Sequence, residues 1–479
     1  MATLFQESVR YVKSKLAGNP AYEPENIKEE QERLVHFRKL YDFYIFDRQR
    51  VLDYVKIAMK ATFKATTIAQ MQFPLYNLTK KIINQLAVAY LEPATRYVVV
   101  PKATQTQGTE TIQIGDKKAE QDNETYQEIL ALSNINSASK DWNRLAKLLT
   151  TVYVGVMYRE GKIEYELFPP HSIEVKAQDD DYLEPALVQY DRKFGKGTLT
   201  YIWTPTEHRI VDKDNRMVET LNPWVGVNKY GVIPFLPCRL SVPGDHWGEG
   251  DTELVSVNEK IDILIASMVY NAIMQSHSQP FGVNLHLDDR EAGELQTGPG
   301  RVIEVNDVSK EDALPSFEFV TPQPAIEANV RAIDWMLKAL ALSKGLSAQS
   351  VSPEVSESSG VSKMVDLNEL RERRRDDVEF LRPFEKRLFD ITRIVWNTNE
   401  EKQISDDAVF GIDFAEPELP MTAKEELEIK EKKMALGLYS PVQDMCDEDE
   451  GIDEEQAMAY IMKNMQWNQM IQKARGNAG

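Results

Sequence analysis

Residues 251–279 read DTELVSVNEKIDILIASMVYNAIMQSHSQ, and residues 325–344 read AIEANVRAIDWMLKALALSK. In the first stretch apolar residues recur every three or four positions, which predicts one face of an α-helix: Leu254, Val257, Ile261, Leu264, Met268 and Ala272. A second apolar stripe runs beside the first: Ile265, Val269 and Ile273. The second stretch carries a heptad seam: Ile326, Val330, Ile333, Leu337 and Leu340. At about 1.5 Å per residue, each helix would span roughly 30 Å or more.

A compact segment, residues 280–324, separates the two helices. It contains three strand-like runs and a Gly-Pro-Gly turn at 298–300; the runs are FGVNLHL, GRVIEV and FEFV. Short β-rich runs bounded by glycine and proline predict strands and turns. The central part of the chain is therefore predicted to be a hairpin of two long helices with a small mixed module at one end.

The residues before this hairpin divide into a helical and a strand-rich part. Residues 1–91 carry helical spacing, including an amphipathic start and a helix that opens at Phe73-Pro74. A polar stretch at 104–122 suggests a loop or short hairpin, and a further helix is expected from about Gln121 to Thr151. From Tyr153 to Pro234 the period changes to that of a meander of antiparallel strands. Asp251 is then a candidate N-cap for the first long helix.

The residues after the hairpin begin with a serine-rich loop at 345–359, which holds six serines and no Lys or Arg. A very long helix is expected at 361–397, with a kink or break at Pro383. The last region, 421–479, is predicted to be helical and interrupted at 444–455, where eight acidic residues occur without a base. The fold class predicted from these patterns is α+β, mainly helical.

The composition excludes several classes of protein. The net charge is −20, which is atypical of a protein that holds nucleic acid tightly, because phosphate contacts require a basic surface. The most apolar stretch, 263–274, is too short to cross a bilayer, which needs roughly 20 apolar residues, so no membrane association is expected. Cys238 and Cys446 are the only cysteines, so a disulfide framework is excluded and a reducing compartment fits.

A search for chemical motifs finds no phosphate-binding loop, no nucleophile elbow and no paired zinc histidines. The acidic run at Asp447 departs from a calcium loop, because Gly451 falls at position 5 and Met458 replaces the bidentate glutamate. We therefore expect no catalytic residues, no metal and no cofactor. The charged cluster 371–377 is more typical of a salt-bridged subunit interface or a solvated face than of a phosphate site.

The order of these segments resembles the portal proteins of tailed double-stranded-DNA bacteriophages along nearly the whole chain. Four places carry the resemblance: FPLYNLTKKIINQLAVAYLEP (73–93), YGVIPF (230–235) leading to WGEGDTELVSVNEKID (247–262), SSGVSKMVDLNEL (358–370) and PELPMTAKEELEIKEKKMALGLYS (417–440). In that family about twelve copies form a ring with wing, stem, clip and crown. The acid-rich interruption at 444–455 departs from the family pattern.

Carried onto this sequence, the resemblance implies a wing at 1–250 and 360–415, a two-helix stem at 251–279 and 325–344, a mixed α/β clip at 280–324, a tunnel loop at 345–359 and a helical crown at 416–479. It implies DNA-proximal residues in and beside the tunnel loop: Gln349, Ser350, Val351, Ser352, Pro353, Lys338 and Lys344. For partner docking by the clip we select Asp288, Asp289, Arg290 and Glu291. Candidate subunit-interface residues are Glu327, Arg331, Asp334, Arg373 and Arg375.

The function that the resemblance implies is a virion channel, assembled in the host cytoplasm at one capsid vertex and used for DNA packaging and ejection. The expected partners are further copies of the chain, double-stranded DNA, the terminase packaging motor, the major capsid and scaffolding proteins, and the head-completion and tail proteins. Two alternatives remain open. One is a capsid or scaffolding component that forms no channel, and the other is a nuclease that uses clustered carboxylates and a divalent metal.

Overall fold

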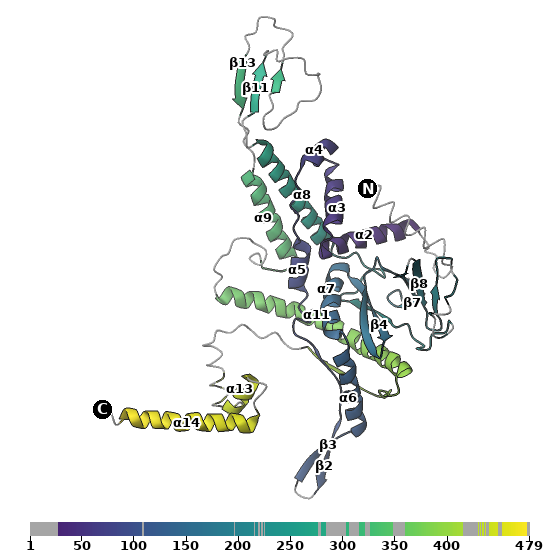
Figure 1. The fold of residues 1–479 in the computed structure, drawn as a ribbon, viewed down its shortest axis with the longest axis vertical. Helices are drawn as coiled ribbons and strands as arrows, with labels where there is room; N and C mark the ends of the chain where they lie inside the picture. The colour runs from purple at the N-terminus through teal and green to yellow at the C-terminus, as the bar shows by residue number, and fades with distance from the viewer. Residues whose placement is uncertain are drawn as a thin grey trace. The chain divides into compact units, whose positions relative to one another are not determined.

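The computed structural model describes residues 27–107, 110–195, 197–214, 216–218, 221, 224, 226–275, 279–283, 303–305, 316–320, 326–347, 360–414, 430, 432, 434, 436, 440–448 and 453–476 (Figure 1). They belong to two compact units, residues 1–416 and 417–479. Helix and strand are mixed, with several small sheets, so the predicted α+β class is confirmed to that extent. The predicted N-terminal amphipathic helix lies outside the described residues.

The first unit begins with helices α2 (Ile27–Ile45), α3 (Arg48–Met59), α4 (Ala65–Gln70) and α5 (Leu78–Leu86). Asp47 caps α3 by accepting a hydrogen bond from the backbone N–H of Arg50, at 3.3 Å. Asn77 caps α5 by accepting from the N–H of Lys80, at 2.9 Å. The predicted start of the latter helix at Phe73 is therefore wrong, because the cap at Asn77 sets its first turn.

Two helices, α6 (Lys117–Leu132) and α7 (Ile135–Leu149), replace the single helix expected from Gln121 to Thr151. The break falls at Asn134, whose side chain bonds to the backbone of Tyr165 in both directions. It donates to the carbonyl at 2.9 Å and accepts from the N–H at 2.8 Å. Side-chain bonds of this kind compete with helical backbone bonds, and here they tie the interhelical corner to a strand. Of the loop or short hairpin expected at 104–122, the hairpin is present, as β2 (Lys102–Gln107) and β3 (Glu110–Gly115).

Antiparallel strands follow, as the change of period predicts. One sheet has the order β10-β4-β5 and the other β6-β7-β8-β9. Their strands are β4 (Thr151–Arg159), β5 (Lys162–Phe168), β6 (Ile173–Ala177), β7 (Pro185–Phe194), β8 (Gly197–Trp203), β9 (His208–Val211) and β10 (Phe235–Arg239). Glu160 and Gly161 join β4 to β5 with φ of 50° and 79°, the positive values that a two-residue hairpin turn requires. The last strand, β10, returns to the first sheet and pairs antiparallel with β4.

The core of this unit lies between α7, the β10-β4-β5 sheet and the long helix α11 (Gly360–Asn399). Trp142 is fully buried at its centre, in edge-to-face contact with Tyr90, Tyr165 and Phe384. Helix α11 continues through Pro383, so of the kink or break expected there the break does not occur, and the kink stays a prediction. Proline removes one helical hydrogen bond, and burial of neighbouring apolar side chains of α11 in this core offsets that loss: Leu381, Phe384, Leu388 and Phe389.

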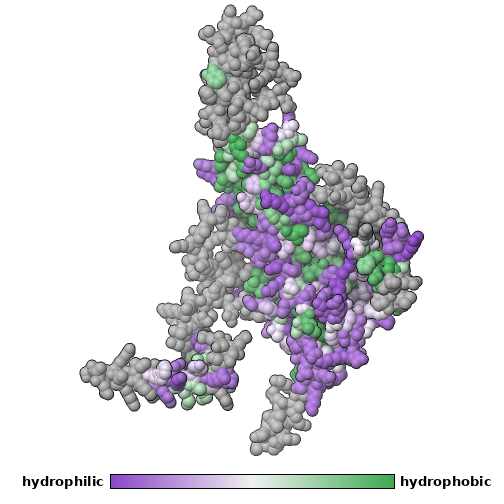
Figure 2. All heavy atoms as spheres, in the orientation of Figure 1, coloured by the Kyte–Doolittle hydropathy of each residue, from purple (hydrophilic) through white to green (hydrophobic). Residues whose placement is uncertain are grey.

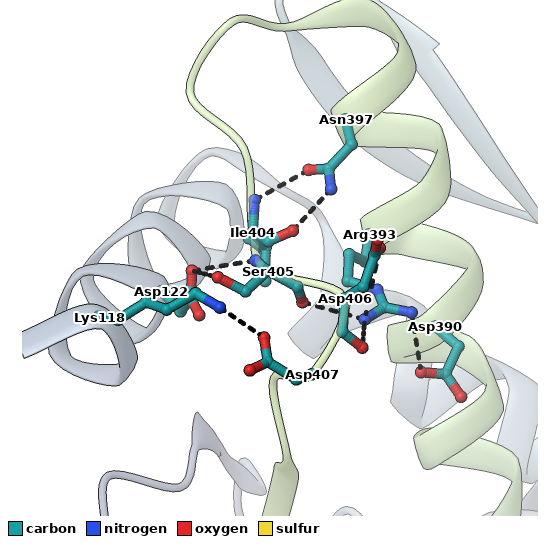
Figure 3. A network of polar contacts seen from close by, with 9 residues as sticks. All are labelled: Lys118, Asp122, Asp390, Arg393, Asn397, Ile404, Ser405, Asp406 and Asp407. Atoms are coloured by element: carbon teal, nitrogen blue, oxygen red, sulfur yellow. Dashed lines mark hydrogen bonds and ion pairs between the residues drawn. The ribbon is translucent and has the colours of Figure 1, made fainter. Parts of the chain in front are cut away.

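After α11 the chain turns back beside its own last turns and beside α6 (Figure 3). The Asn397 side chain bonds both backbone groups of Ile404, and the Arg393 guanidinium donates to the carbonyl of Ser405 at 3.0 Å. From α6, Asp122 accepts from the N–H and hydroxyl of Ser405. These bonds direct the chain into β14 (Phe410–Asp413), which pairs with β1 (Thr95–Val98).

The remaining elements of the first unit are the two long helices and the strands between them. Helix α8 is Thr252–Gln275 and α9 is Ile326–Ser343. Between them β11 (Gln279–Val283) pairs in parallel with β12 (Ile303–Val305) and antiparallel with β13 (Ser316–Val320), at the three places where the sequence predicts strands. The second unit, considered by itself, contains α13 (Pro441–Glu448) and α14 (Glu454–Gly476).

Candidate functional site: the paired helices α8 and α9

Helices α8 and α9 pack against each other, as their apolar stripes predict, but the seam is buried mainly at one end. Near the C-terminus of α9, Leu340 and Ala341 are buried in the main core and Leu337 is packed against it. Towards the other end Val330, a predicted seam residue, is 50% exposed. The pair is therefore anchored at the base of α8 and extends away from the core.

An ion-pair cluster closes the base of the helix pair. The Lys344 ammonium lies 2.8 Å from an Asp251 carboxylate oxygen and 3.0 Å from one of Glu253, which joins the end of α9 to the start of α8. Burial by itself would lower the pKa of Lys344, but the hydrogen bonds from these two carboxylates outweigh burial and raise it above its ordinary value. Asp251 also caps α8 through the N–H of Leu254, as predicted.

Helix α9 ends in a glycine C-cap. Gly345 has φ of +56°; its N–H donates to the carbonyl of Leu342, and the N–H of Leu346 donates to that of Ala341. This is the Schellman pattern, in which a left-handed residue satisfies the last carbonyls of a helix. Leu346 is buried, so the position at which the chain leaves α9 towards the predicted tunnel loop is fixed by packing.

Replacing Gly345 by alanine is expected to destabilise the protein by about 1–2 kcal/mol, because an L side chain is strained at this positive φ. Urea unfolding measures the change. Gly244→Ala is the matched control, since Gly244 lacks a left-handed φ and a Cβ added there would meet no atom within 4 Å. Equal stability of the Gly345→Ala variant and the parent would contradict the Schellman assignment.

The base of α8 is also tied to α5 by a buried asparagine. The carbonyl oxygen of the Asn258 side chain accepts from the N–H and the hydroxyl of Thr79, at 3.0 and 2.9 Å. Its amide nitrogen donates to the backbone carbonyl of Tyr76 and to Asp262, both at 3.1 Å. Asp262 in turn accepts from the N–H of Tyr76 at 3.2 Å. Asn258 and Asp262 are both buried, so these bonds set how α8 meets α5.

The electrostatics of this contact are unusual at Asp262. Desolvation by burial, assisted by the nearby charge of Glu259, raises the pKa of this carboxyl to about 7. The hydrogen bonds from Tyr76 and Asn258 oppose that shift without cancelling it. The contact between α8 and α5 therefore contains a group that changes charge near neutral pH.

The described candidate residues on α9 lie in one charged stripe. Glu327 and Arg331 are 3.7 Å apart, and Asp334 and Lys338 are 2.6 Å apart, so each base has an acid one helical turn before it. Pairs with this spacing and order stabilise a helix from within. The interface role predicted for Glu327, Arg331 and Asp334 stays a prediction, as does the DNA proximity of Lys338.

Other candidate residues lie elsewhere or outside the described part of the chain. Arg375 is exposed on α11, and Lys344 is half-buried in the cluster at the helix base. The described side chains do not include Arg373. Two predicted groups also lie outside the described residues: the tunnel-loop residues Gln349, Ser350, Val351, Ser352 and Pro353, and the clip residues Asp288, Asp289, Arg290 and Glu291.

An apolar stripe that was not predicted from the sequence lies on the side of α9 roughly opposite its seam. The stripe repeats the spacing of four and three residues and consists of Ala328, Ala332, Trp335, Ala339 and Leu342. Trp335 is 71% exposed and Leu342 is 67% exposed. Figure 2 shows hydrophobic residues gathered over the α8–α9 pair, beside hydrophilic ones. The repeat was readable from the sequence, but its exposure was not.

Among the described residues, no group of three or more His, Cys, Asp or Glu side chains is placed to hold a metal ion. None of the described helices has the length and apolar character needed to span a membrane.

The sequence matches no protein-family model and no curated protein. Among solved structures, a chain of one titled "Virion of native gene transfer agent (GTA) particle" is similar to this chain. The similarity covers 81% of this chain and 96% of that chain, with a TM-score of 0.35 and 9% sequence identity.

Proposed function

We propose that this protein is a virion component that assembles into a ring around a channel for double-stranded DNA, as a phage portal does. In this proposal α8 and α9 form the stem, the strands β11–β13 belong to the clip, and the residues after α9 form the tunnel loop. The ring stands at one capsid vertex among the capsid and scaffolding proteins. It docks the terminase motor and later the head-completion and tail proteins, and it performs no bond chemistry itself.

The exposed stripe of α9 is the observation that carries this proposal. A heptad repeat of apolar residues is the pattern that packs against another helix, and the alanines of this stripe allow close approach. The seam on the other side of α9 is already used by α8. The charged stripe of Glu327, Arg331, Asp334 and Lys338 forms ion pairs within α9 itself, so it does not require a charged partner from another copy. A helix of another copy is the partner that such a face fits, and the uncharged stretch of α8 from Ile263 to Gln275 supplies one.

A contact from α9 of one copy to α8 of the next is heterologous, because the two surfaces differ. Heterologous contacts generate closed rings when the rotation between copies closes, whereas a two-fold contact stops at a dimer. The resemblance of the sequence to portal proteins supports the closed ring of about twelve copies.

Electron microscopy and sedimentation of the purified protein test the proposal. Annular particles with a central hole are expected. Trp335→Glu should shift the population towards small species, because loss of a central tryptophan costs about 2 kcal/mol or more at an interface and each copy in a ring uses that interface twice. Phe194→Glu, at a 58% exposed position at the end of β7, is the matched control and should leave the rings intact.

Compact monomers or closed shells formed by the unaltered protein would overturn the channel. If rings persist in the Trp335→Glu variant, the proposed channel still stands, but the exposed stripe is not part of the interface between copies.

A further inference from the structure

Helix α14 of the second unit exposes large apolar side chains at five of ten consecutive positions. Each is between 54% and 61% exposed: Met458, Tyr460, Met462, Met465 and Trp467. Single exposed apolar residues are ordinary on a protein surface, but a group of them marks an interaction site. A helix that is apolar on several sides is normally buried. The second unit, considered by itself, therefore has an apolar surface that the described residues do not cover.

The helical repeat of 3.6 residues places three of these side chains in one row. They are Met458, Met462 and Met465, which we call the methionine stripe. Their spacing of four and three residues is the pattern of anchors by which one helix contacts another. Methionine is unbranched and polarisable, so a row of methionines adapts to apolar side chains of different shapes. The methionine stripe therefore fits a second helix that has an apolar row of its own.

The other faces of α14 differ from the methionine stripe. Ala457 is buried and Ile461 is half-buried, and these two residues mark the face that is covered where α14 packs against α13. Tyr460 and Trp467 are seven residues apart and lie roughly opposite the methionine stripe. The ammonium of Lys463 lies 5.6 Å from the centre of the Trp467 ring, so this aromatic face carries a positive charge.

The sequence around the methionine stripe is acidic. Residues 441–479 hold eight acidic and three basic residues, a net charge of 3 − 8 = −5, and all eight acids precede Met458. Residues 444–462 include no basic residue. Glu454 and Glu455 stand four and three positions before Met458, so on the surface of α14 their positions are neighbours of the stripe.

This charge indicates the kind of helix that fits the stripe. Complementary charges favour one partner over another, and like charges brought together across an interface are unfavourable. A helix with basic residues beside its apolar row complements the acidic start of α14. A second copy of residues 441–479 would instead add a further charge of −5 to the contact. The partner with the better match is therefore a basic helix from a different protein.

We infer that the methionine stripe of α14 docks a basic amphipathic helix of another protein. The apolar row of that helix covers Met458, Met462 and Met465, and its lysine or arginine side chains reach the acidic start of α14. The stripe lies in the second unit, whereas the proposed contact between copies uses α8 and α9 of the first unit. This docking therefore does not depend on the formation of a ring.

Isothermal titration of the full-length protein with designed peptides tests this docking. The probe is a peptide of about 21 residues, or three heptads, with leucine at the two apolar positions of each heptad and lysine and alanine elsewhere. One comparison peptide has glutamate in place of lysine, and another has the composition of the probe in an order that forms no apolar row. The probe should bind at least about tenfold more tightly than either comparison peptide. Its affinity should fall as salt is raised from about 50 to 500 mM.

Two variants with matched exposure locate the site. Met462→Gln combined with Met465→Gln should weaken binding of the probe at least about tenfold, because two apolar contacts are lost. Tyr460→Gln combined with Trp467→Gln removes two side chains of similar exposure from the opposite face and should retain the affinity. Glutamine and methionine have similar helix propensities, so α14 should remain helical, which circular dichroism checks.

Four outcomes would overturn this docking. Equal affinities for the lysine and glutamate peptides would exclude a basic partner, and equal losses in the two variants would exclude the methionine stripe as the site. An unaltered protein that binds none of the peptides would exclude the docking site itself. Smaller particles in sedimentation of the Met462→Gln, Met465→Gln variant, without peptide, would assign the stripe to contacts between copies. The Trp335→Glu variant should bind the probe as the unaltered protein does, which separates this test from that of the ring.

Discussion

Replacing Glu385 by glutamine should cost about 3–5 kcal/mol of folding free energy, because it leaves a buried guanidinium without its counter-charge. Glu385 of α11 accepts two hydrogen bonds from Arg96 of β1, at 2.6 and 2.9 Å, and one from the hydroxyl of Tyr90, at 2.6 Å. The Arg96 and Glu385 side chains are each 1% exposed. Burial alone would lower the pKa of Arg96, but Glu385 outweighs it and raises that pKa. Urea unfolding measures the loss.

A matched control lies two residues further along the same helix. Arg387 makes a bidentate pair with Glu184, at 2.6 and 2.7 Å, but its side chain is 50% exposed. Exposed pairs contribute about 0–1 kcal/mol, so Glu184→Gln should have a small effect. Replacing both Arg96 and Glu385 by methionine should recover part of the loss, because no charge then remains buried. Equal losses for the two single variants would contradict the importance of burial.

This ion pair also shows where prediction from the sequence ends. The sequence predicts the long helix around Glu385 but no element at Arg96, and the two residues are 289 positions apart. Nothing in the local pattern pairs them, since the contact depends on how α11 crosses the sheet. Lys344 is a similar case. Its charge is visible in the sequence, but its two partners at the start of α8 are supplied by the packing of the helix pair.

The local patterns, in contrast, predict the elements well. The spacing of apolar residues gives α8 and α9, the serine-rich composition gives the end of α9, and the turn residues give the β4–β5 hairpin. The sequence predicts less well at points where a contact between distant parts of the chain determines where a helix ends or which side chains are covered. The side chain of Asn134 divides a helix by bonding to a strand, and packing in the core keeps α11 unbroken at Pro383, where the sequence predicts either a kink or a break. The exposure of Trp335 is not predictable either, because the pattern of residues along a helix does not show which of its faces are covered.

Asp262 gives the second large effect, and its sign follows from the raised pKa. An unfolded aspartate has a pKa of about 3.9, whereas burial raises the pKa of Asp262 in the folded protein to about 7. Between these values the folded state holds a proton that the unfolded state has released. The stability that this group contributes is therefore complete below about pH 4 and is lost as the pH rises to about 7.

The loss amounts to about 4 kcal/mol, since each pKa unit corresponds to about 1.4 kcal/mol. It is measured as the difference in unfolding free energy between the unaltered protein and the Asp262→Asn variant at a series of pH values. The other carboxylates contribute equally to both proteins, so their effects cancel in this difference. Relative to the variant, the unaltered protein should lose stability from about pH 4 to pH 7 and remain level above that. A difference that does not change with pH would show that Asp262 is not desolvated.

Because Asp262 and Asn258 join α8 to α5, the same titration weakens the attachment of the helix pair. Hydrogen exchange at the base of α8 should therefore speed up relative to the Asp262→Asn variant over the same pH range, beyond the intrinsic increase of exchange with pH.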